Sequence, residues 1–222
     1  MSSPAPLANA PPPSVRAATR DDLPEMARLA AQLVRLHHEF DPLRFFVQEP
    51  IEPGYTWWFG RELQNPSAVL LVAEQPSSQG PRIVGYAYGC LEERDWNALL
   101  DACAYLHDIL VTPEARQTGV AAQLLETIAE RFKEKGAPRM VLQTATNNIA
   151  AQRLFKKHGF REIMIEMTRE LGFAFEIGGH DVAHHRARCA RPGLPSVRAR
   201  SQARCARSRE ALLFGAEMVQ CA

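Results

Sequence analysis

LHDILVTPEARQTGVAAQLLETIAERFKEKGAPRMVLQTATNNIAAQRLFKKHGF, residues 106–160, carries the strongest structural signals in this 222-residue chain. Its first apolar run, 106–111, predicts a strand, and the polar loop that follows opens at Gly119 into a helix. A second strand, 139–144, leads through an Asn-rich turn into a second helix, which Gly159 ends. This alternation of strands and helices indicates an α/β fold with a mixed sheet.

The loop before Gly119 predicts an anion site. The first four backbone N–H groups of a helix have no partner within the helix, and that end of the helix dipole is positive. Phosphate groups bind such ends, and Gly119 allows close approach because it has no Cβ. Arg116 adds a fixed positive charge. We therefore expect a phosphate or pyrophosphate on the amides from Gln117 to Ala121. An ordinary turn is the alternative, because short glycine motifs have false positives.

Two motifs in this stretch resemble a known family. Residues 116–121, RQTGVA, are similar to the Arg/Gln-x-x-Gly-x-Gly/Ala pattern of the GNAT (GCN5-related) N-acetyltransferases. Residues 148–160, NIAAQRLFKKHGF, are similar to the family's downstream Asn-containing motif. The resemblance covers roughly residues 14–171. It implies a GNAT-like acyl-CoA N-acyltransferase fold, with a mixed central sheet of about six to seven strands flanked by about four helices.

The resemblance also implies acetyl-CoA as the co-substrate and no metal. In the family, the strand before the loop splays from its neighbour, and its open backbone groups bind the pantetheine arm. Asn148 would bond that arm or only cap its helix. Phe155 stands where the family usually has a Tyr that protonates the leaving thiolate, and Phe has no such proton. The implied cofactor-binding residues are Ile109, Leu110, Val111, Arg116, Gln117, Thr118, Gly119, Val120, Ala121, Asn148 and Phe155.

Three side chains are candidates for the general base, because the acceptor amine must lose a proton before it can attack. Asp108 and His107 lie on the central strand, and Glu92 ends the preceding one. Relatives often have acids at the positions of both His107 and Asp108, and only Asp108 keeps one here. Strand residues alternate, so we expect these two side chains to face opposite ways. A structural role is the alternative for each.

An aromatic wall is the predicted acceptor site. Its candidate residues are His38, Trp57, Tyr86 and Tyr88, whose rings could hold an amine by cation–π contact. Core packing is the alternative for these rings, above all for the tryptophan.

Composition limits the classes of protein. A hydrophobic content of 46% is ordinary for a globular domain, and a net charge of +1 argues against bulk binding of nucleic acid or membrane. No apolar run of 18 residues predicts a membrane span. The five cysteines form no CxxC pair and no zinc spacing, so we interpret them as reduced thiols in a cytoplasmic protein.

The predicted organisation is a disordered leader over 1–13, an N-acetyltransferase domain over 14–171 and an Arg-rich tail of low order over 172–222. The tail holds eight arginines and no lysine. A basic arm for nucleic acid or an acidic partner is its alternative role. Within the domain, further strands are expected at 15–18, 68–74, 82–92 and 160–171, and the strand that ends at Val111 is expected to begin at Ala104. Further helices are expected from Thr19 to about His37 and over 56–63.

The leading hypothesis is an enzyme that transfers an acetyl group from acetyl-CoA to a primary amine, on a small molecule or on a lysine side chain. A GNAT-like module that binds acyl-CoA without turnover is the second hypothesis, supported by Phe155 and by the missing acid at His107. A nucleic-acid protein acting through the tail is the third. The sequence leaves a homodimer open and does not name the acceptor.

Overall fold

The structure, a computed structural model, describes residues 13–78 and 80–170. The predicted leader, apart from its last residue, and the whole predicted tail lie outside these ranges. The chain divides into two units, whose described parts are residues 13–161 and residues 162–170. All helices and strands that are described below belong to the first unit.

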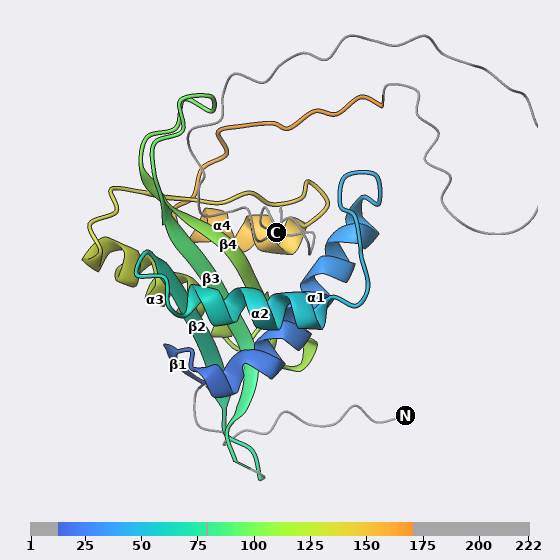
Figure 1. Ribbon diagram of the computed structural model, residues 1–222, viewed down its shortest axis with the longest axis vertical. Coiled ribbons are helices and arrows are strands. Elements are labelled where there is room, and N and C mark those ends of the chain that lie inside the picture. Colours follow the sequence, from blue (N-terminus) through green and yellow to red (C-terminus); the bar gives the residue numbers. More distant parts are fainter. Residues whose placement is uncertain (1–12, 79, 171–222) are drawn as a thin grey trace, which may run out of the picture. The chain divides into compact units, whose positions relative to one another are not determined.

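A five-stranded sheet forms the centre of the first unit (Figure 1). Strands β1 to β4 follow one another as antiparallel neighbours, and β5 pairs parallel to β4. The mixed sheet is as expected, although the described residues contain five strands in place of six to seven. The strands are β1 Ser14–Ala17, β2 Ala68–Gln75, β3 Arg82–Glu92, β4 Cys103–Val111 and β5 Met140–Val141.

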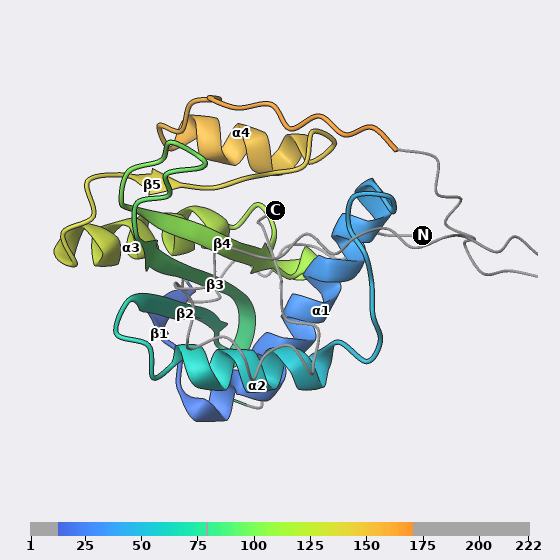
Figure 2. The same cartoon turned by 45° about the horizontal axis from the view of Figure 1, so that its top comes forward.

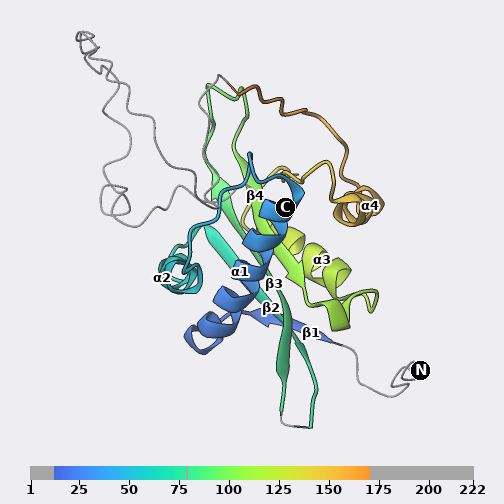
Figure 3. The ribbon, with the colours of Figure 1, turned by 90° about the vertical axis from the view of Figure 1, so that its right-hand side faces the viewer.

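Four helices cover the two faces of the sheet. In Figure 3, α1 and α2 lie on one side of it and α3 and α4 on the other. The helix predicted over 56–63 begins earlier than expected, because Pro53 fits a first helical turn, where its missing N–H costs nothing. The helices are α1 Leu23–Phe40, α2 Glu52–Glu62, α3 Val120–Glu134 and α4 Ile149–Lys157, with short 3-10 turns at Arg20–Asp22 and Pro113–Ala115.

Each face of the sheet has its own hydrophobic core. Met26 and Phe59 on the α1/α2 face, and Ile128 on the α3 face, are all 0% exposed. Burying one such side chain contributes roughly 1.5–3 kcal/mol. Burial on both sides explains why β2 is an almost unbroken apolar run rather than an alternating one. It also fixes which strand residues face which helices.

An ion-pair cluster joins the first strands to the start of α1. Arg16 donates to Asp22 Oδ2 at 2.7 Å and also pairs with Glu74 on the neighbouring strand. The Arg16 hydrogen bond lowers the pKa of Asp22 to about 2. The Thr19 amide also donates to Asp22, at 2.7 Å. Asp22 is therefore a buried carboxylate held ionised at neutral pH.

Two sequence predictions about strands are wrong. The strand expected over 139–144 is limited to Met140–Val141, and residues 160–170 contain no strand. Residues 162–168, EIMIEMT, have a period-two apolar pattern, but a strand also needs a neighbour with which to exchange backbone hydrogen bonds. Periodicity reports which face would be buried and cannot report whether such a neighbour is present.

Candidate active site

The central feature of the site is a split between β4 and β5. These strands pair only at Ala104↔Met140 and Tyr105↔Val141, so β5 accompanies the start of β4 and no more of it (Figure 2). Beyond Tyr105, β4 continues for six residues with β3 as its hydrogen-bonded neighbour. Among residues 13–78 and 80–170, no strand pairs with this second edge of β4 beyond Tyr105, and we call it the open edge.

Backbone alternation fixes which groups face that open edge. The Thr112 amide donates to Val84 O at 2.8 Å, toward β3. Leu110, two residues earlier, faces the same way, so Ile109 and Val111 direct their N–H and C=O groups away from β3. Of the three strand residues predicted to bind a pantetheine arm, these two have the required direction and Leu110 does not.

The loop after β4 leaves its amides accessible. No backbone amide from residue 117 to residue 122 donates a hydrogen bond within the part of the chain that the structure describes. The Thr118 hydroxyl turns back to Ala115 O at 2.7 Å and does not fill the turn. Arg116 Nε lies 3.4 Å from Val111 O, which ties the loop to the open edge of β4. The predicted anion site is therefore an accessible cradle of backbone donors.

Gly119 shapes this cradle. Its φ is +90°, a left-handed conformation that other residues rarely adopt, and no atom lies within 4 Å of the position that a Cβ would take. Gln117 is left-handed as well, with a φ of 64°. Two left-handed residues around Thr118 fold the loop into a concavity of N–H groups, a geometry that binds anions. The residues present fit a diphosphate.

A β-bulge changes which way the candidate bases point. Tyr88 pairs with Asp108, whereas the next β3 residue, Gly89, pairs with Leu106, so His107 is an extra residue in β4. Leu106 packs in the α3 core, while Asp108 bonds to a tyrosine of the α1/α2 core and His107 stacks on another. The prediction that the side chains of His107 and Asp108 face opposite ways is wrong, because alternation fails at a bulge. Both face α1 and α2.

Gly89 makes room for the bulge. A Cβ on it would lie 2.6 Å from Tyr105 O and 2.9 Å from a ring atom of Phe132. Any larger residue would push the strands apart at the place where His107 is inserted. The direction of the His107 side chain therefore depends on a residue of the neighbouring strand.

Asp108 is a buried carboxylate with one occupied oxygen. It is 1% exposed, and Oδ2 accepts from the Tyr86 hydroxyl at 3.0 Å. Oδ1 is buried without a hydrogen-bond partner among the described residues. Burial raises the pKa of Asp108 to about 6, against the lowering effect of His107 and of Tyr86. This carboxylate is poised to lose or accept a proton near neutral pH.

His107 lies against two aromatic rings and one carboxylate. Its ring is nearly parallel to Tyr88 at 5.2 Å and to Tyr105 at 4.9 Å, measured between ring centroids. Nε2 is 3.3 Å from Glu92 Oε1, and the His107 side chain is 21% exposed. The structure therefore brings all three predicted base candidates to one face of the sheet, and His107 lies two residues beyond the last β4–β5 pair.

Comparison with known proteins places this geometry in a family. The acetyltransferase (GNAT) family model matches residues 31–160, more than half of the chain. The chain belongs to the GNAT acetyltransferase family. As a GNAT enzyme it is an acetyl-CoA-dependent N-acetyltransferase, and the acceptor of the acetyl group is an amine.

Individual relatives agree with this assignment. The chain is 29% identical over 166 residues to thialysine N-epsilon-acetyltransferase of Mus musculus, an alignment that covers 73% of this chain and 91% of that protein. The tetramutant of the BH1408 protein from Bacillus halodurans has a TM-score of 0.59 at 22% identity, covering 71% of this chain and 99% of that chain. AAC(6')-Iy in complex with a CoA bisubstrate analog has a TM-score of 0.56 at 22% identity, covering 71% and 97%. The two solved structures establish the GNAT fold.

Glu62 lies behind the predicted acceptor face and was missed from the sequence. It is 7% exposed on α2, and its Oε2 accepts from the Tyr88 hydroxyl at 3.1 Å and from Asn65 at 2.9 Å. The available signal was its position, because Tyr55, Phe59 and Glu62 share one helical stripe. A carboxylate on an otherwise apolar stripe indicates a buried partner. Tyr105, beside His107, was missed as well.

Two residues predicted for the acceptor site, one on α1 and one on α2, already contact other residues of the chain. His38 Nδ1 lies 2.7 Å from Phe45 O, in the loop after α1. Trp57 is 45% exposed, and the Arg61 guanidinium carbon lies 5.0 Å from the centroid of its ring. Arg61 therefore already covers one face of that ring. Tyr86 and Tyr88 are buried, and their hydroxyls hold Asp108 and Glu62.

The α4 residues of the GNAT motif have clear structural roles. Asn148 Oδ1 accepts from the Ala151 amide at 3.2 Å, so Asn148 caps α4. Phe155 is 3% exposed and packs beside Phe160 at 5.7 Å between ring centroids. Val120 is buried as well, so it can offer a ligand only its amide. Phe155 offers the leaving thiolate no proton.

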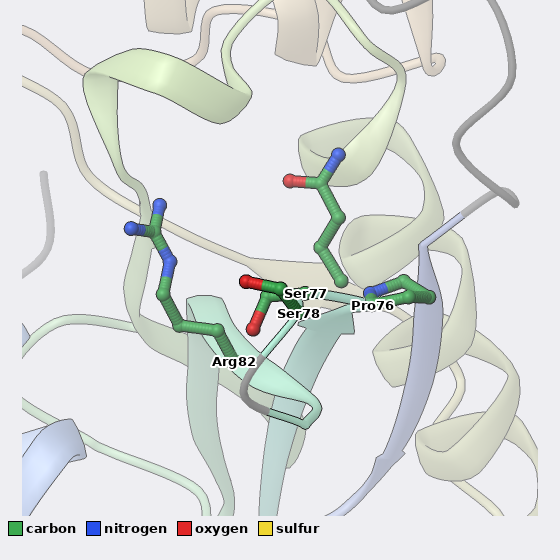
Figure 4. A pocket seen from close by; sticks show the side chains of 5 residues that line it. Pro76, Ser77, Ser78 and Arg82 are labelled. Atoms are coloured by element: carbon green, nitrogen blue, oxygen red, sulfur yellow. The ribbon is translucent and has the colours of Figure 1, made fainter.

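The remaining features of the described residues stand apart from this site. A cavity at the turn between β2 and β3 is lined by Gln75, Pro76, Ser77, Ser78 and Arg82 (Figure 4), none of them a predicted site residue. Within 13–78 and 80–170, no group of three or more His, Cys, Asp or Glu side chains could hold a metal. In the same ranges no helix is long and apolar enough to cross a membrane. Cys90, by contrast, lies beside the site as the register partner of Tyr105, and it is free and buried, as is Cys103.

Proposed function

We propose that the acceptor is a primary alkylamine, either a small molecule or a lysine side chain, that approaches the α1/α2 face of β4 beside the bulge. The observation that carries this proposal is the convergence of His107, Asp108 and Glu92 on that face, next to the open edge of β4. Acidic groups favour a cationic acceptor, and aromatic rings beside them suit an ammonium group. The similarity to thialysine N-epsilon-acetyltransferase supports an amine carried on a flexible alkyl chain.

Acetyl-CoA supplies the acetyl group as a thioester. In the proposal its diphosphate accepts hydrogen bonds from the amides of residues 117–121, with Arg116 beside them. The outward-facing groups of Ile109 and Val111 hold the pantetheine amides. Negative charge develops on the thioester oxygen during the reaction. A backbone N–H already aimed at that oxygen needs no reorganisation, which is worth roughly 3–4 kcal/mol per donor in comparable sites.

In this proposal the two ends of the site have separate tasks. The backbone groups of residues 109–121 position the thioester, and the side chains on the α1/α2 face receive the amine and its proton. Holding the two reactants together converts a bimolecular reaction into an effectively unimolecular one. Phe155 leaves the thiolate to collect its proton from the amine or from solvent.

The test is a thiol-release assay with acetyl-CoA and a panel of amines. The panel contains thialysine, lysine, a linear diamine, an arylamine and an aminoglycoside, each with a reaction lacking amine as its control. We expect the highest kcat/KM with the linear alkylamines. Thiol release with the arylamine alone would overturn the proposed acceptor class. Thermal stabilisation by CoA without thiol release from any amine would overturn acetyl transfer to the whole panel.

A further inference from the structure

The bulge in β4 presents an imidazole whose two nitrogens have different surroundings. Nε2 lies 3.3 Å from Glu92 Oε1, while Nδ1 has no hydrogen-bond partner among residues 13–78 and 80–170. A carboxylate on one imidazole nitrogen holds the proton there and leaves a lone pair on the other. The 21% exposure of the His107 side chain leaves that lone pair within reach of a ligand.

We propose that His107 is the general base of this enzyme, through Nδ1, and that Glu92 is a positioning residue that holds the proton on Nε2. This inference rests on the proposed function. It assigns the role of proton acceptor to a histidine at a position where the family resemblance leads us to expect an acid. Asp108, the neighbouring acid, is fully buried and already bonded to Tyr86, so it supports the face rather than meeting the amine.

Stacking fixes the plane of the imidazole. Its ring is inclined by 22° to Tyr88 and by 28° to Tyr105, so it stacks on both tyrosine rings. The Tyr88 hydroxyl is anchored on Glu62 of α2, which holds the first of these rings. Since the bulge sets the direction of His107 and the rings set its plane, Nδ1 has a defined position. A base so held needs little reorganisation to accept a proton.

The charged and titratable groups around His107 come from three elements. On β3 these are Tyr88, Glu92 and Cys90, the register partner of Tyr105. On β4 they are Tyr105 and Asp108, and α2 contributes Glu62 behind Tyr88. The imidazole is thus bordered by carboxylates on β3 and β4 and by two tyrosine rings.

The proton and electron balance follows from these positions. The acceptor ammonium gives one proton to Nδ1, and its freed lone pair forms the C–N bond to the acetyl carbon. The C–S bond breaks and sulfur keeps the electron pair. The nitrogen's second proton neutralises the thiolate, and Nδ1 releases the first to solvent. The sum is one amide, one thiol and one proton.

The kinetic test compares His107→Gln, His107→Glu and Glu92→Gln with the wild type across about pH 5–9, the range in which an imidazole changes charge. We expect His107→Gln to lower kcat about 100-fold, as for loss of a general base, with the KM for acetyl-CoA unchanged. It should also abolish the low-pH limb of the kcat profile. His107→Glu should recover part of the rate with the limb moved to lower pH. A His107→Gln variant with wild-type kcat and pH profile would overturn the proposal.

The matched control for Glu92 is Arg94→Ala, which breaks the exposed Arg94–Asp101 ion pair of the same hairpin. Glu92→Gln should lower kcat about tenfold and shift the pH profile. Without the carboxylate, the imidazole proton is found partly on Nδ1, which then has no lone pair to accept the proton of the amine. Arg94→Ala should change neither. Equal effects of the two variants would contradict a positioning role for Glu92.

A second measurement does not depend on turnover. Nitrogen-15 NMR of the histidines, with the His107→Gln spectrum identifying the signal, reports which ring nitrogen carries the proton. The proposal requires the Nε2–H form in the wild type and a mixture in Glu92→Gln. An Nδ1–H form in the wild type would overturn the proposed base, even if no amine of the panel were acetylated. The absence of thiol release from a wild type with the Nε2–H form would overturn the proposed function alone.

Discussion

The two ends of the site, the Gly119 loop and the α1/α2 face of β4, are built in different ways. The loop offers backbone amides, and what it needs from the sequence is one left-handed glycine and a helix start. The face offers the side chains of His107, Asp108 and Tyr86, which come from two strands, and His107 joins the other two only because of the bulge. A site made of backbone groups is local in sequence, and a site made of side chains depends on register.

This difference explains why a cofactor end is easy to recognise and an acceptor end is not. A loop conformation needs few residue types, and those types remain visible as a motif. The acceptor face can be rebuilt by moving one bulge or exchanging one side chain, as the histidine at position 107 illustrates. Three substitutions test the two ends separately, and they are ordered here by the size of the expected effect.

The largest effect is expected at Asp108, on the acceptor face. Its pKa is raised from 3.8 to about 6, so the folded state binds a proton more tightly than the unfolded state. The stabilisation from this proton is complete below about pH 3.8 and is lost as the pH rises through about 6, on the order of 3 kcal/mol in all. Asp108→Asn should remove this loss, as measured by urea unfolding at several pH values.

Asp22 gives the opposite dependence and serves as the internal reference. Its pKa is lowered to about 2, so its contribution is present above about pH 3.8 and is lost as the pH falls through 2. Asp22→Asn should therefore flatten the stability curve below about pH 4 and leave the range from 4 to 6 unchanged. If the stability curves of Asp108→Asn and the wild type are parallel between about pH 4 and 6, burial does not raise the pKa of Asp108.

An intermediate effect is expected at Gly119, on the cofactor end. In Gly119→Val a side chain occupies the space in front of the amides, and the left-handed conformation becomes strained. We expect the KM for acetyl-CoA to rise about 10- to 100-fold, which corresponds to losing one charge-assisted hydrogen bond. Steady-state kinetics at saturating amine measures this change.

Gly136→Val is the matched control. Gly136 follows the other end of α3, has a φ of +85° and likewise has no atom within 4 Å of a Cβ position. Both variants carry the same backbone strain on the same helix, so a rise in KM with Gly119→Val alone locates the effect at the cradle. Equal KM values for the two variants would contradict a diphosphate on these amides.

The smallest effect is expected at Asn148. Asn148→Ala removes the cap of α4 and should lower the free energy of unfolding by about 1 kcal/mol. If the side chain is only a cap, the KM for acetyl-CoA stays at the wild-type value. A raised KM, absent from the neighbouring variant Asn147→Ala, would show that Asn148 also contacts the cofactor.

Much of the cofactor end could be predicted from the sequence. The motif around Gly119, the strand before it and the helix after it are local, and local backbone preferences decide them. The length of β5 could not be predicted, because it depends on how many residues pair with β4, and only Met140 and Val141 do so. The absence of a strand from residues 160–170 could not be predicted either, because these residues carry the apolar pattern of a strand.

The sequence by itself determined the α/β class, the family and the accessible amides of the Gly119 turn, because each depends on short-range periodicity or on a residue without a Cβ. Only the tertiary structure decided the direction of His107, the burial of Asp108 and Glu62, and the split of β4 from β5. Those properties depend on how two strands are aligned and which helix covers them. An inserted residue in β4 changes that alignment without any local mark in the sequence.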